Sequence, residues 1–392
     1  MYMIGKEEIE ELTKLIQSAR LFKTDSSLKE AEQVENKLKD ILKCEHAIFM
    51  TSGHAALVSA LAAMGIGPGD EVIVPGYTYI ATAMAVVSVG AMPVIAEIDE
   101  TLTLSPKDFE NKITKHTKAV IPVHIQGLPC NMDAIMEIAK KHNVYVLEDT
   151  CQADGGSYKG KRLGTIGDAG AMSFNYYKII SCGEGGALIT GNKEFFEKAL
   201  IYHDSSAVAF FGDQMRGFAT EGFCGNEYRS NELCAAVLNV QLSRLDSILA
   251  GLRANKKYMM DALQGCCKFA ASNDIEGDCG TALAFQFETE AQARAFATAE
   301  GVAGSLPIDA DRHVYKNWKP ILEKKGAINP LMDPFKMEAN KDILPDYRED
   351  MCPETLDILS RTVLVGTGLG GEREALDKRI ELIKKALLNI SK

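Results

Sequence analysis

The stretch "DEVIVPGYTYIATAMAVVSVG", residues 70–90, decides the fold, because an apolar, β-branched run is followed at once by an apolar run of helical length. The same alternation extends over residues 46–149. Strand-like runs at 46–51, 118–125 and 144–149 alternate with helical patterns at 55–65 and 132–142. Strands that alternate with helices of about ten residues indicate βαβ crossovers. The sequence therefore predicts an α/β fold whose mostly parallel central sheet is flanked by helices.

The pattern changes beyond about residue 190. A helical pattern over 229–264 is longer than a typical globular helix, so we expect it to bridge two domains. We place the boundary within it, which gives a large domain at 1–248 and a small domain at 249–392. A strand-like run at 281–289 and helical patterns at 290–301 and 372–390 predict that the small C-terminal domain is α+β.

Composition excludes several classes of function. The net charge of -11 argues against a nucleic-acid partner. The N-terminus is acidic rather than signal-like, and no apolar run is long enough to span a bilayer, so we expect no membrane insertion. The ten cysteines form no CxxC pair and indicate reduced thiols in the cytoplasm. No His, Cys or Asp cluster has metal-ligand spacing, which predicts no metal.

Ligands of parallel sheets bind beyond the carboxyl ends of the strands, so the residues that end each run carry the candidate chemistry. "EDTCQADGG", residues 148–156, places Asp149 there, either facing a ligand or capping a helix. "TSGHAAL", residues 51–57, starts a helix whose N–H groups can bind an anion, although Ser52 can also be a plain cap.

Lys178 stands in the apolar stretch "MSFNYYKIISCGEGGALIT", residues 172–190. An unpaired ammonium near a core is costly, so such a lysine reaches solvent, is paired, or is used chemically. The nearby Ser173 and the glycines at 183–186 favour chemical use. An amine, a strand-end carboxylate and a phosphate cradle are together the components of a pyridoxal phosphate site.

Five ordered motifs now carry a resemblance: "TSGHAAL", "VPGYTYIATA" (74–83), "EDTCQADGGSYKGKRLGTIGDAGAMSF" (148–174), "CGEGGALIT" (182–190) and "GNEYRSNELCAAVLNVQLSRLD" (225–246). Together they resemble the pyridoxal-phosphate-dependent sugar aminotransferases of fold type I, in the aspartate aminotransferase superfamily. The resemblance implies a fold type I transferase with pyridoxal 5′-phosphate as cofactor. It also implies an amino donor such as L-glutamate, a sugar acceptor, and a homodimer with shared active sites.

The resemblance also implies a role for each matching residue. Lys178 takes the position of the lysine that forms the Schiff base and moves a proton, and Asp149 that of the partner of the pyridine nitrogen. The other cofactor-binding positions are Gln152 near the ring hydroxyl, Tyr79 on the ring face, Ser173, Gly53 and His54 at the phosphate, and Asn226 in a loop lent to the neighbouring subunit. His54, Asp154 and Glu227 depart from the family pattern.

Candidate substrate contacts are Arg229, Arg312, His313 and Tyr315, together with Arg216, and the Gly- and aromatic-rich stretch 203–223 is either an active-site loop or a connector. The departures and the ending "CPETLDILSRTVLVGTGLG" (352–370) resemble enzymes that aminate C8 of a 3,8-dideoxy-manno-octulosonate for lipopolysaccharide. The alternatives are a nucleotide-sugar aminotransferase, a non-catalytic pyridoxal-phosphate-binding regulator, and a nucleotide-binding α/β protein.

Overall fold

Seven strands form the central sheet of the computed structural model, which describes residues 3–23, 27–206, 217–368 and 373–390. Their order is β1 (His46–Met50), β9 (Gly186–Thr190), β8 (Ala169–Ser173), β5 (Tyr145–Asp149), β4 (Thr117–Val120), β2 (Glu71–Pro75) and β3 (Met92–Ala96). The five strands from β8 to β3 pair in parallel, whereas β9 is antiparallel to both of its neighbours. The predicted mostly parallel sheet is therefore confirmed.

Helices cover both faces of this sheet, which is why strands such as β2 are buried along their whole length. One face packs against α3 (Gly53–Ala63), α4 (Ala81–Ser88) and α7 (Lys193–His203). The other packs against α2 (Glu30–Leu42), α5 (Pro106–Asn111), α6 (Met132–His142) and α8 (Glu232–Ala262). Successive residues of a strand alternate between the two cores: Ile48 belongs to the first and Phe49 to the second.

A second, antiparallel sheet forms the small α+β unit that the sequence predicts. It contains β10 (Lys268–Phe269), β11 (Ala282–Gln286) and β12 (Thr362–Gly366), and it shares a core with α9 (Glu290–Ala297) and α12 (Arg373–Ile390). The chain between α9 and β12 returns to the large sheet, where Trp318 and Tyr347 join the core that contains α3, α4 and α7. That segment includes α10 (Lys319–Leu322) and α11 (Pro353–Ser360). Elsewhere in the chain, β6 (Ser157–Tyr158) pairs with β7 (Lys161–Arg162) in a separate two-stranded hairpin.

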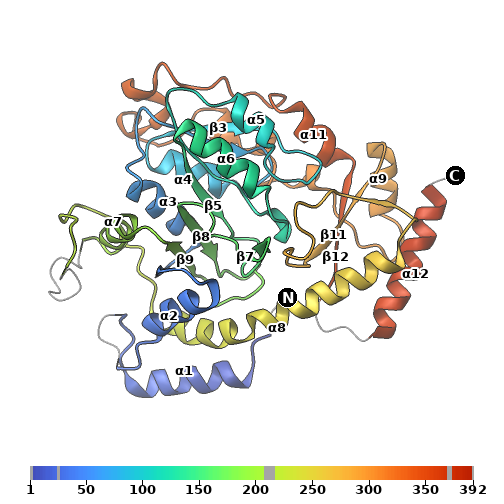
Figure 1. Ribbon diagram of the computed structural model, residues 1–392, viewed down its shortest axis with the longest axis horizontal. Coiled ribbons are helices and arrows are strands. Elements are labelled where there is room, and N and C mark those ends of the chain that lie inside the picture. The colour runs from blue at the N-terminus through green and yellow to red at the C-terminus, as the bar shows by residue number, and fades with distance from the viewer. Residues whose placement is uncertain (1–2, 24–26, 207–216, 369–372, 391–392) are drawn as a thin grey trace.

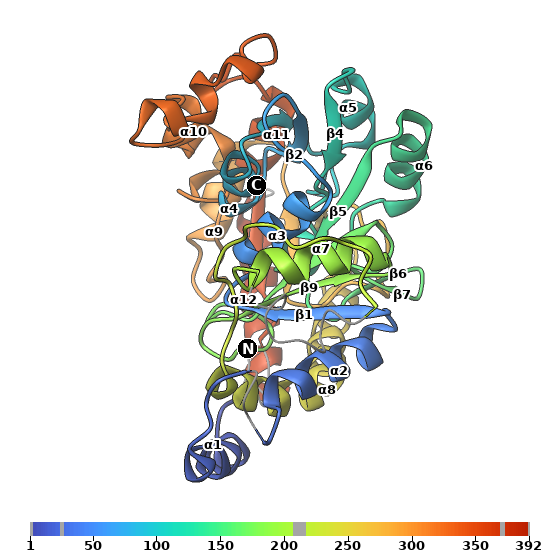
Figure 2. The same ribbon diagram turned by 90° about the vertical axis from the view of Figure 1, so that its left-hand side faces the viewer.

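The long helix α8 connects the two units, as expected (Figure 1 and, turned by 90°, Figure 2). Its first part contributes Leu238 and Leu252 to the core of the large sheet, and its last part contributes Met259 to the core of the small one. In the described ranges α8 is the one helix long and apolar enough to cross a membrane, but half of its apolar 18-residue segment is buried inside the protein. Since α8 passes through residue 248 without a break, the domain boundary there stays a prediction.

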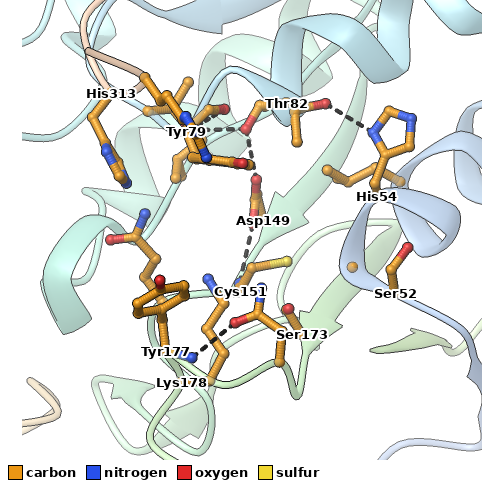
Figure 3. A pocket seen from close by; sticks show the side chains of 18 of the residues that line it. Ser52, His54, Tyr79, Thr82, Asp149, Cys151, Ser173, Tyr177, Lys178 and His313 are labelled. Carbon is orange, nitrogen blue, oxygen red and sulfur yellow. Dashed lines mark hydrogen bonds between the residues drawn. The ribbon is translucent and has the colours of Figure 1, made fainter. Parts of the chain in front are cut away.

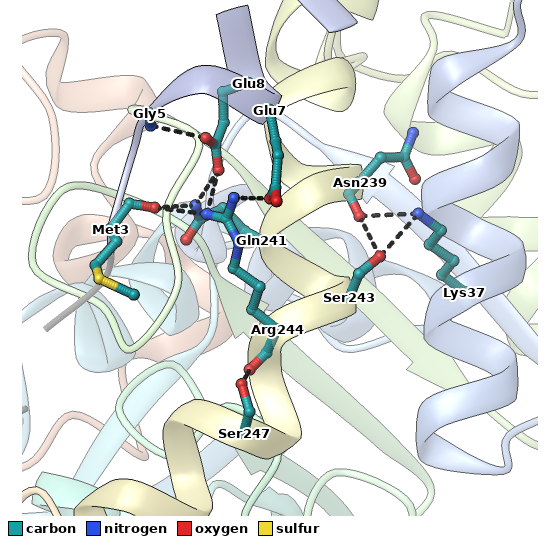
Figure 4. Close-up of polar contacts among 10 residues, drawn as sticks. All are labelled: Met3, Gly5, Glu7, Glu8, Lys37, Asn239, Gln241, Ser243, Arg244 and Ser247. Atoms are coloured by element: carbon teal, nitrogen blue, oxygen red, sulfur yellow. Dashed lines mark hydrogen bonds and ion pairs between the residues drawn. The ribbon is translucent and has the colours of Figure 1, made fainter. Parts of the chain in front are cut away.

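The N-terminal helix α1 (Lys6–Ser18) is fastened to α8 by buried polar contacts (Figure 4). The carboxylate of Glu8, 1% exposed, accepts hydrogen bonds from the Gly5 amide (2.8 Å), the Gln241 side chain (2.6 Å) and Arg244 (2.7 Å). Arg244 also pairs with Glu7. We call these five residues the N-terminal latch. Burial raises the pKa of Glu8, but hydrogen bonds from the Gly5 and Glu8 amides and from Gln241, together with the charge of Arg244, outweigh it and leave that pKa lowered.

Candidate active site

A cavity of about 710 Å³ opens beyond the carboxyl ends of the parallel strands, where α/β folds bind their ligands (Figure 3). The loops after β1, β2, β5 and β8 line it, and a segment from the C-terminal part of the chain completes it. Nine of the predicted site residues lie on its wall: Gly53, His54, Tyr79, Asp149, Gln152, Ser173, Lys178, Arg312 and His313. The fold thus brings together residues that are up to 260 positions apart in the sequence.

Asp149 ends strand β5 and is 4% exposed. Its two carboxylate oxygens accept hydrogen bonds from the Thr82 hydroxyl (2.8 Å) and the Cys151 amide (3.0 Å). Donors of this kind fix the direction of the carboxylate. Turns rather than a helix follow at 150–156, so the alternative that Asp149 caps a helix is wrong.

Lys178 lies in the loop between β8 and β9, five residues after the end of the strand. The loop is closed at its neck by two hydrogen bonds, from the Phe174 amide to the Gly185 carbonyl (2.8 Å) and from the Cys182 amide to the Phe174 carbonyl (3.0 Å). Lys178 is half-buried, and among the residues that the structure describes its amine forms no ion pair. A half-buried amine without a carboxylate partner is available for chemistry at the cavity.

The turn between β1 and α3 forms another side of the cavity. The Ser52 hydroxyl caps α3 by accepting a hydrogen bond from the Ala55 amide (3.1 Å), and the same residue lines the cavity. A Cβ atom on Gly53 would lie 2.6 Å from the Cys151 sulfur and 2.8 Å from Cβ of Ser173, so only glycine fits. The first N–H groups of the helix can therefore approach an anion closely.

His54 is turned toward α4 rather than toward Lys178 (Figure 3). Its Nδ1 donates to the Ala81 carbonyl (3.2 Å), and burial lowers the pKa of the ring, so the imidazole is neutral at physiological pH. A phosphate contact from this position stays a prediction. Gln152 accepts a hydrogen bond from the Gln126 amide (3.1 Å), which fixes its side chain on the cavity wall.

Residues 312–313 reach the cavity because they pair with the chain after β2. The Thr78 amide donates to the His313 carbonyl (2.9 Å), and the Ile80 amide donates to the Arg312 carbonyl (2.8 Å). The rings of Tyr79 and His313 are 5.4 Å apart. Burial and the charges of Lys178 and Arg312 lower the pKa of His313. Arg312 is exposed and makes no ion pair with any residue in the described ranges.

Tyr315 was expected to contact substrate, and this is wrong. Its side chain is fully buried in the core, where its hydroxyl donates to the Glu349 carbonyl (2.8 Å) and accepts from the Cys352 amide (2.9 Å). These contacts fix the C-terminal segment on the large sheet and do not reach the cavity.

Asn226 and Arg229 lie away from this chain's own cavity. The Asn226 side chain donates to the Tyr202 hydroxyl (2.7 Å), and Arg229 pairs with Glu227 (2.8 Å), which offsets the charge of that unexpected acid. Their roles at a neighbouring subunit stay predictions. Arg216, with residues 207–215 of the stretch 203–223, lies outside the described residues.

Several residues of the cavity wall were not predicted from the sequence. Thr82 matters most among them, because it donates a hydrogen bond to Asp149. Thr82 stands three positions after Tyr79 in the same motif, and that spacing on a helix start was the available signal. The others are Ser52 as a lining residue, Cys151, Asn175, Tyr177, Glu184 and Asp311. No group of three or more His, Cys, Asp or Glu side chains in the described ranges could hold a metal ion, and the predicted absence of a metal stays a prediction.

Asp154, a departure from the family pattern, is fully buried, and neither of its carboxyl oxygens has a hydrogen-bond partner among the described residues. Burial raises its pKa well above the usual range, while the nearby charge of Lys178 opposes that shift.

Residues 2–306 match the DegT/DnrJ/EryC1/StrS aminotransferase family. The chain belongs to this family. The predicted family is thus confirmed, and with it the predicted class of fold and of cofactor, pyridoxal 5′-phosphate.

Individual relatives agree with this assignment. The chain is 40% identical over 251 residues to the spore coat polysaccharide biosynthesis protein SpsC of Bacillus subtilis, covering 63% of this chain and 64% of that one. It is 41% identical over 219 residues to GDP-perosamine synthase of Caulobacter vibrioides, covering 56% and 57%. The match thus spans less than two thirds of these relatives. An aminotransferase structure from Psychrobacter cryohalolentis is 26% identical, with a TM-score of 0.79 over 100% of this chain and 98% of that one.

Proposed function

We propose that this protein transfers an amino group from a donor, L-glutamate, to the carbonyl of a sugar, with pyridoxal 5′-phosphate as cofactor. The observation that carries the proposal is the joint presence of the Lys178 amine, the fixed Asp149 carboxylate and the start of α3 on one cavity. Membership of an aminotransferase family supports it.

The residues present fit the cofactor. The glycine-only position at 53, the helix start and the Ser173 hydroxyl offer a cradle for a phosphate, and Asp149 offers a negative charge for a protonated ring nitrogen. The cavity also has room for a substrate, since its volume lies in the usual range for small-molecule sites. When bound, the cofactor supplies an electron sink for the charge that develops on the substrate carbon.

The chain's own residues then have distinct tasks. The Lys178 amine, which forms no ion pair among the described residues, accepts and returns the proton at the reacting carbon as general base and acid. Hydrogen bonds from Thr82 and the Cys151 amide hold the Asp149 side chain in position. The neighbouring rings of Tyr79 and His313 form a wall that excludes water from one side of the cavity.

For the acceptor, we propose the C8 carbonyl of a 3,8-dideoxy-manno-octulosonate used in lipopolysaccharide biosynthesis. Arg312 supports an acidic sugar, because this arginine reaches the cavity without an acidic partner in the described ranges. A nucleotide-linked keto-sugar is the second candidate, and the name of the relative GDP-perosamine synthase favours it. A diphosphate group would also suit Arg312.

We further propose a cytoplasmic homodimer. The free state of all ten cysteines supports a reducing compartment. The exposed side of residues 226–229, which lies away from this chain's own cavity, supports a loop that completes the site of a second subunit.

The test combines the cofactor with the first half of the reaction. The protein is loaded with pyridoxal 5′-phosphate and reduced with borohydride, and peptide mass spectrometry should then locate the cofactor on Lys178. L-Glutamate should change the absorbance of the bound cofactor in the native protein but not in Lys178→Ala. Lys193→Ala, an exposed lysine beyond the same loop, is the matched control. Full glutamate turnover by Lys178→Ala would disprove the proposal.

The acceptor is tested in the second half of the reaction. After treatment with glutamate and removal of the excess, the 8-aldehyde of the octulosonate or a nucleotide-linked keto-sugar is added, and recovery of the initial absorbance is followed. Recovery with the octulosonate, weakened in Arg312→Gln, is the expected result. Recovery with the nucleotide-linked sugar alone would reject the preferred acceptor and keep the aminotransferase.

A further inference from the structure

Gln126 has a strained backbone conformation. It belongs to the short helical turn η1 (Ile125–Gly127), which follows strand β4. Its φ of 53° and ψ of 25° lie in the left-handed region, which residues other than glycine rarely adopt. Such a conformation persists only where the surrounding structure holds it, and it often marks a functional position.

Hydrogen bonds hold Gln126 from both sides. Its amide donates to Oε1 of Gln152 on the wall of the Lys178 cavity (3.1 Å). Its carbonyl accepts from the hydroxyl of Thr281 (2.5 Å), which stands directly before β11 of the small sheet. The Thr281 carbonyl in turn accepts from the Thr367 amide, directly after β12 (3.1 Å). A single residue, Gln126, therefore links the small sheet to the cavity wall.

These contacts decide which end of the Gln152 side-chain amide is left for a ligand. A backbone N–H can only donate, so the atom that it meets on Gln152 is the oxygen. The nitrogen of the same amide donates to no group of the described residues. Gln152 lines both the main cavity and a smaller recess of about 230 Å³, which Lys178 and Thr281 also line.

We propose that Gln126, held by Thr281, is a positioning residue, which orients Gln152 so that its amide nitrogen donates a hydrogen bond to the ring oxygen of bound pyridoxal 5′-phosphate. This role rests on the proposed function, because it requires that cofactor in the cavity. The ring hydroxyl of pyridoxal phosphate is adjacent to the carbonyl group with which a lysine amine reacts. Gln152 and Lys178 share the walls of the cavity and of the recess, so the part of the cofactor that meets Lys178 can also meet Gln152.

The orientation of the Gln152 amide matters because its two ends have opposite effects on a neighbouring oxygen. An N–H that donates to the ring oxygen favours the ionised form and lowers the pKa of the bound cofactor. An amide turned the other way presents its own oxygen and has the opposite effect. Without the Thr281 hydroxyl, the strained turn at Gln126 loses the bond to its carbonyl, and Gln152 loses its fixed donor.

An absorbance titration of the cofactor-loaded protein, without any substrate, tests this role. In Thr281→Val, the midpoint pH of the change in cofactor absorbance should rise by about one pH unit, because valine cannot donate to the Gln126 carbonyl. Thr281→Ser keeps the hydroxyl and should restore the native midpoint. Thr298→Val is the matched control, since this hydroxyl donates to the Arg294 carbonyl within its own helix. An unchanged midpoint in Thr281→Val would overturn the proposal.

A double-mutant cycle shows whether Thr281 acts through Gln152. Gln152→Leu removes the amide altogether, so the midpoint should rise by about as much as in Thr281→Val. Adding Thr281→Val to Gln152→Leu should then raise it no further. Additive rises would mean that Thr281 acts by another route, and would reject the role of Gln126.

The backbone of Gln126 is tested separately. Gln126→Gly keeps the amide and readily adopts the left-handed conformation, so it should keep the native midpoint. Gln126→Val, with a branched side chain that disfavours this conformation, should raise it. In the cofactor-free protein, amide hydrogen exchange at residue 126 should become about tenfold faster in Gln152→Leu, while exchange at the Cys279 amide, which donates to Gly127, stays the same. Equal midpoints for the glycine and valine variants, or unaltered exchange at residue 126, would contradict the proposal.

Failure of this role and failure of the proposed function give different results. Protein that binds the cofactor and reacts with L-glutamate, but whose midpoint does not respond to Thr281→Val, keeps the transaminase and rejects the role of Gln126. Protein that binds no pyridoxal 5′-phosphate rejects both.

Discussion

Glu8 in the N-terminal latch and Asp154 near Lys178 are both buried from solvent, yet their pKa values shift in opposite directions. Glu8 receives three hydrogen bonds, and its pKa is lowered. Asp154 receives none from the described residues, and its pKa is raised. Burial alone therefore does not decide the direction in which the pKa of a carboxyl group shifts in this protein. In the latch, hydrogen bonds satisfy the Glu8 carboxylate and stabilise the fold. Near Lys178, by contrast, the Asp154 carboxyl oxygens stay without hydrogen-bond partners among the described residues.

The largest effect should come from the site. Asp149→Asn removes the charge that would face the cofactor ring, so we expect the rate of the glutamate half-reaction to fall about a thousandfold. The melting temperature of the cofactor-free protein should change little, because an amide can keep the hydrogen bond from Thr82. Stopped-flow absorbance and calorimetry measure the two quantities. A large loss of stability with normal turnover would reverse the comparison.

The latch should show the opposite pattern. Glu8→Gln replaces charge-assisted hydrogen bonds with neutral ones and should lower the free energy of unfolding by about 2 kcal/mol, with activity kept. Because the folded pKa of Glu8 is lowered, this difference should be present near neutral pH and vanish as pH falls through that pKa. Glu7→Gln, on the exposed side of Arg244, is the control and should cost under about 0.5 kcal/mol.

Thr82→Val tests the positioning of Asp149, because it removes one hydrogen-bond donor to Asp149 and leaves the carboxylate in place. We expect the glutamate half-reaction to slow about tenfold, which corresponds to the loss of one hydrogen bond to a charged group. Thr82→Ser keeps the hydroxyl and should restore most of the rate. Equal rates for the valine and serine variants would show that this bond does not position Asp149.

The smallest effect on activity is expected for Asp154→Asn, whose change should appear in the pH dependence of stability. Since the folded pKa of Asp154 is raised, its contribution to stability is present in acid and declines as pH rises from about 4 toward the folded value. The amide variant does not titrate at this position, so its free energy of unfolding should rise relative to that of the native protein as pH increases across this range. Urea unfolding at several pH values measures the difference. A native protein that gains stability relative to the variant as pH rises would contradict the assignment.

Local patterns were sufficient to predict the parallel sheet, the length of α8, and the position of Asp149 at the end of a strand, because strand and helix periods depend on neighbouring residues. Tyr315 was misplaced because only Arg312 and His313 of residues 312–315 line the cavity, whereas the next two residues, Val314 and Tyr315, are buried in the core. The latch was not predicted at all. It joins residues more than 230 positions apart, and no local signal records such a contact.

The edge position of β1 has a consequence for the order in which the protein can assemble during synthesis. Its partner in the sheet is β9, and the helices before it, α1 and α2, pack on α8. At about 5–20 residues per second, a ribosome needs roughly 12–47 seconds to travel from the latch residues of α1 to Arg244. The first strand and both leading helices must wait for this time without their partners, so chains released before α8 is made should expose apolar surface and be recognised by chaperones.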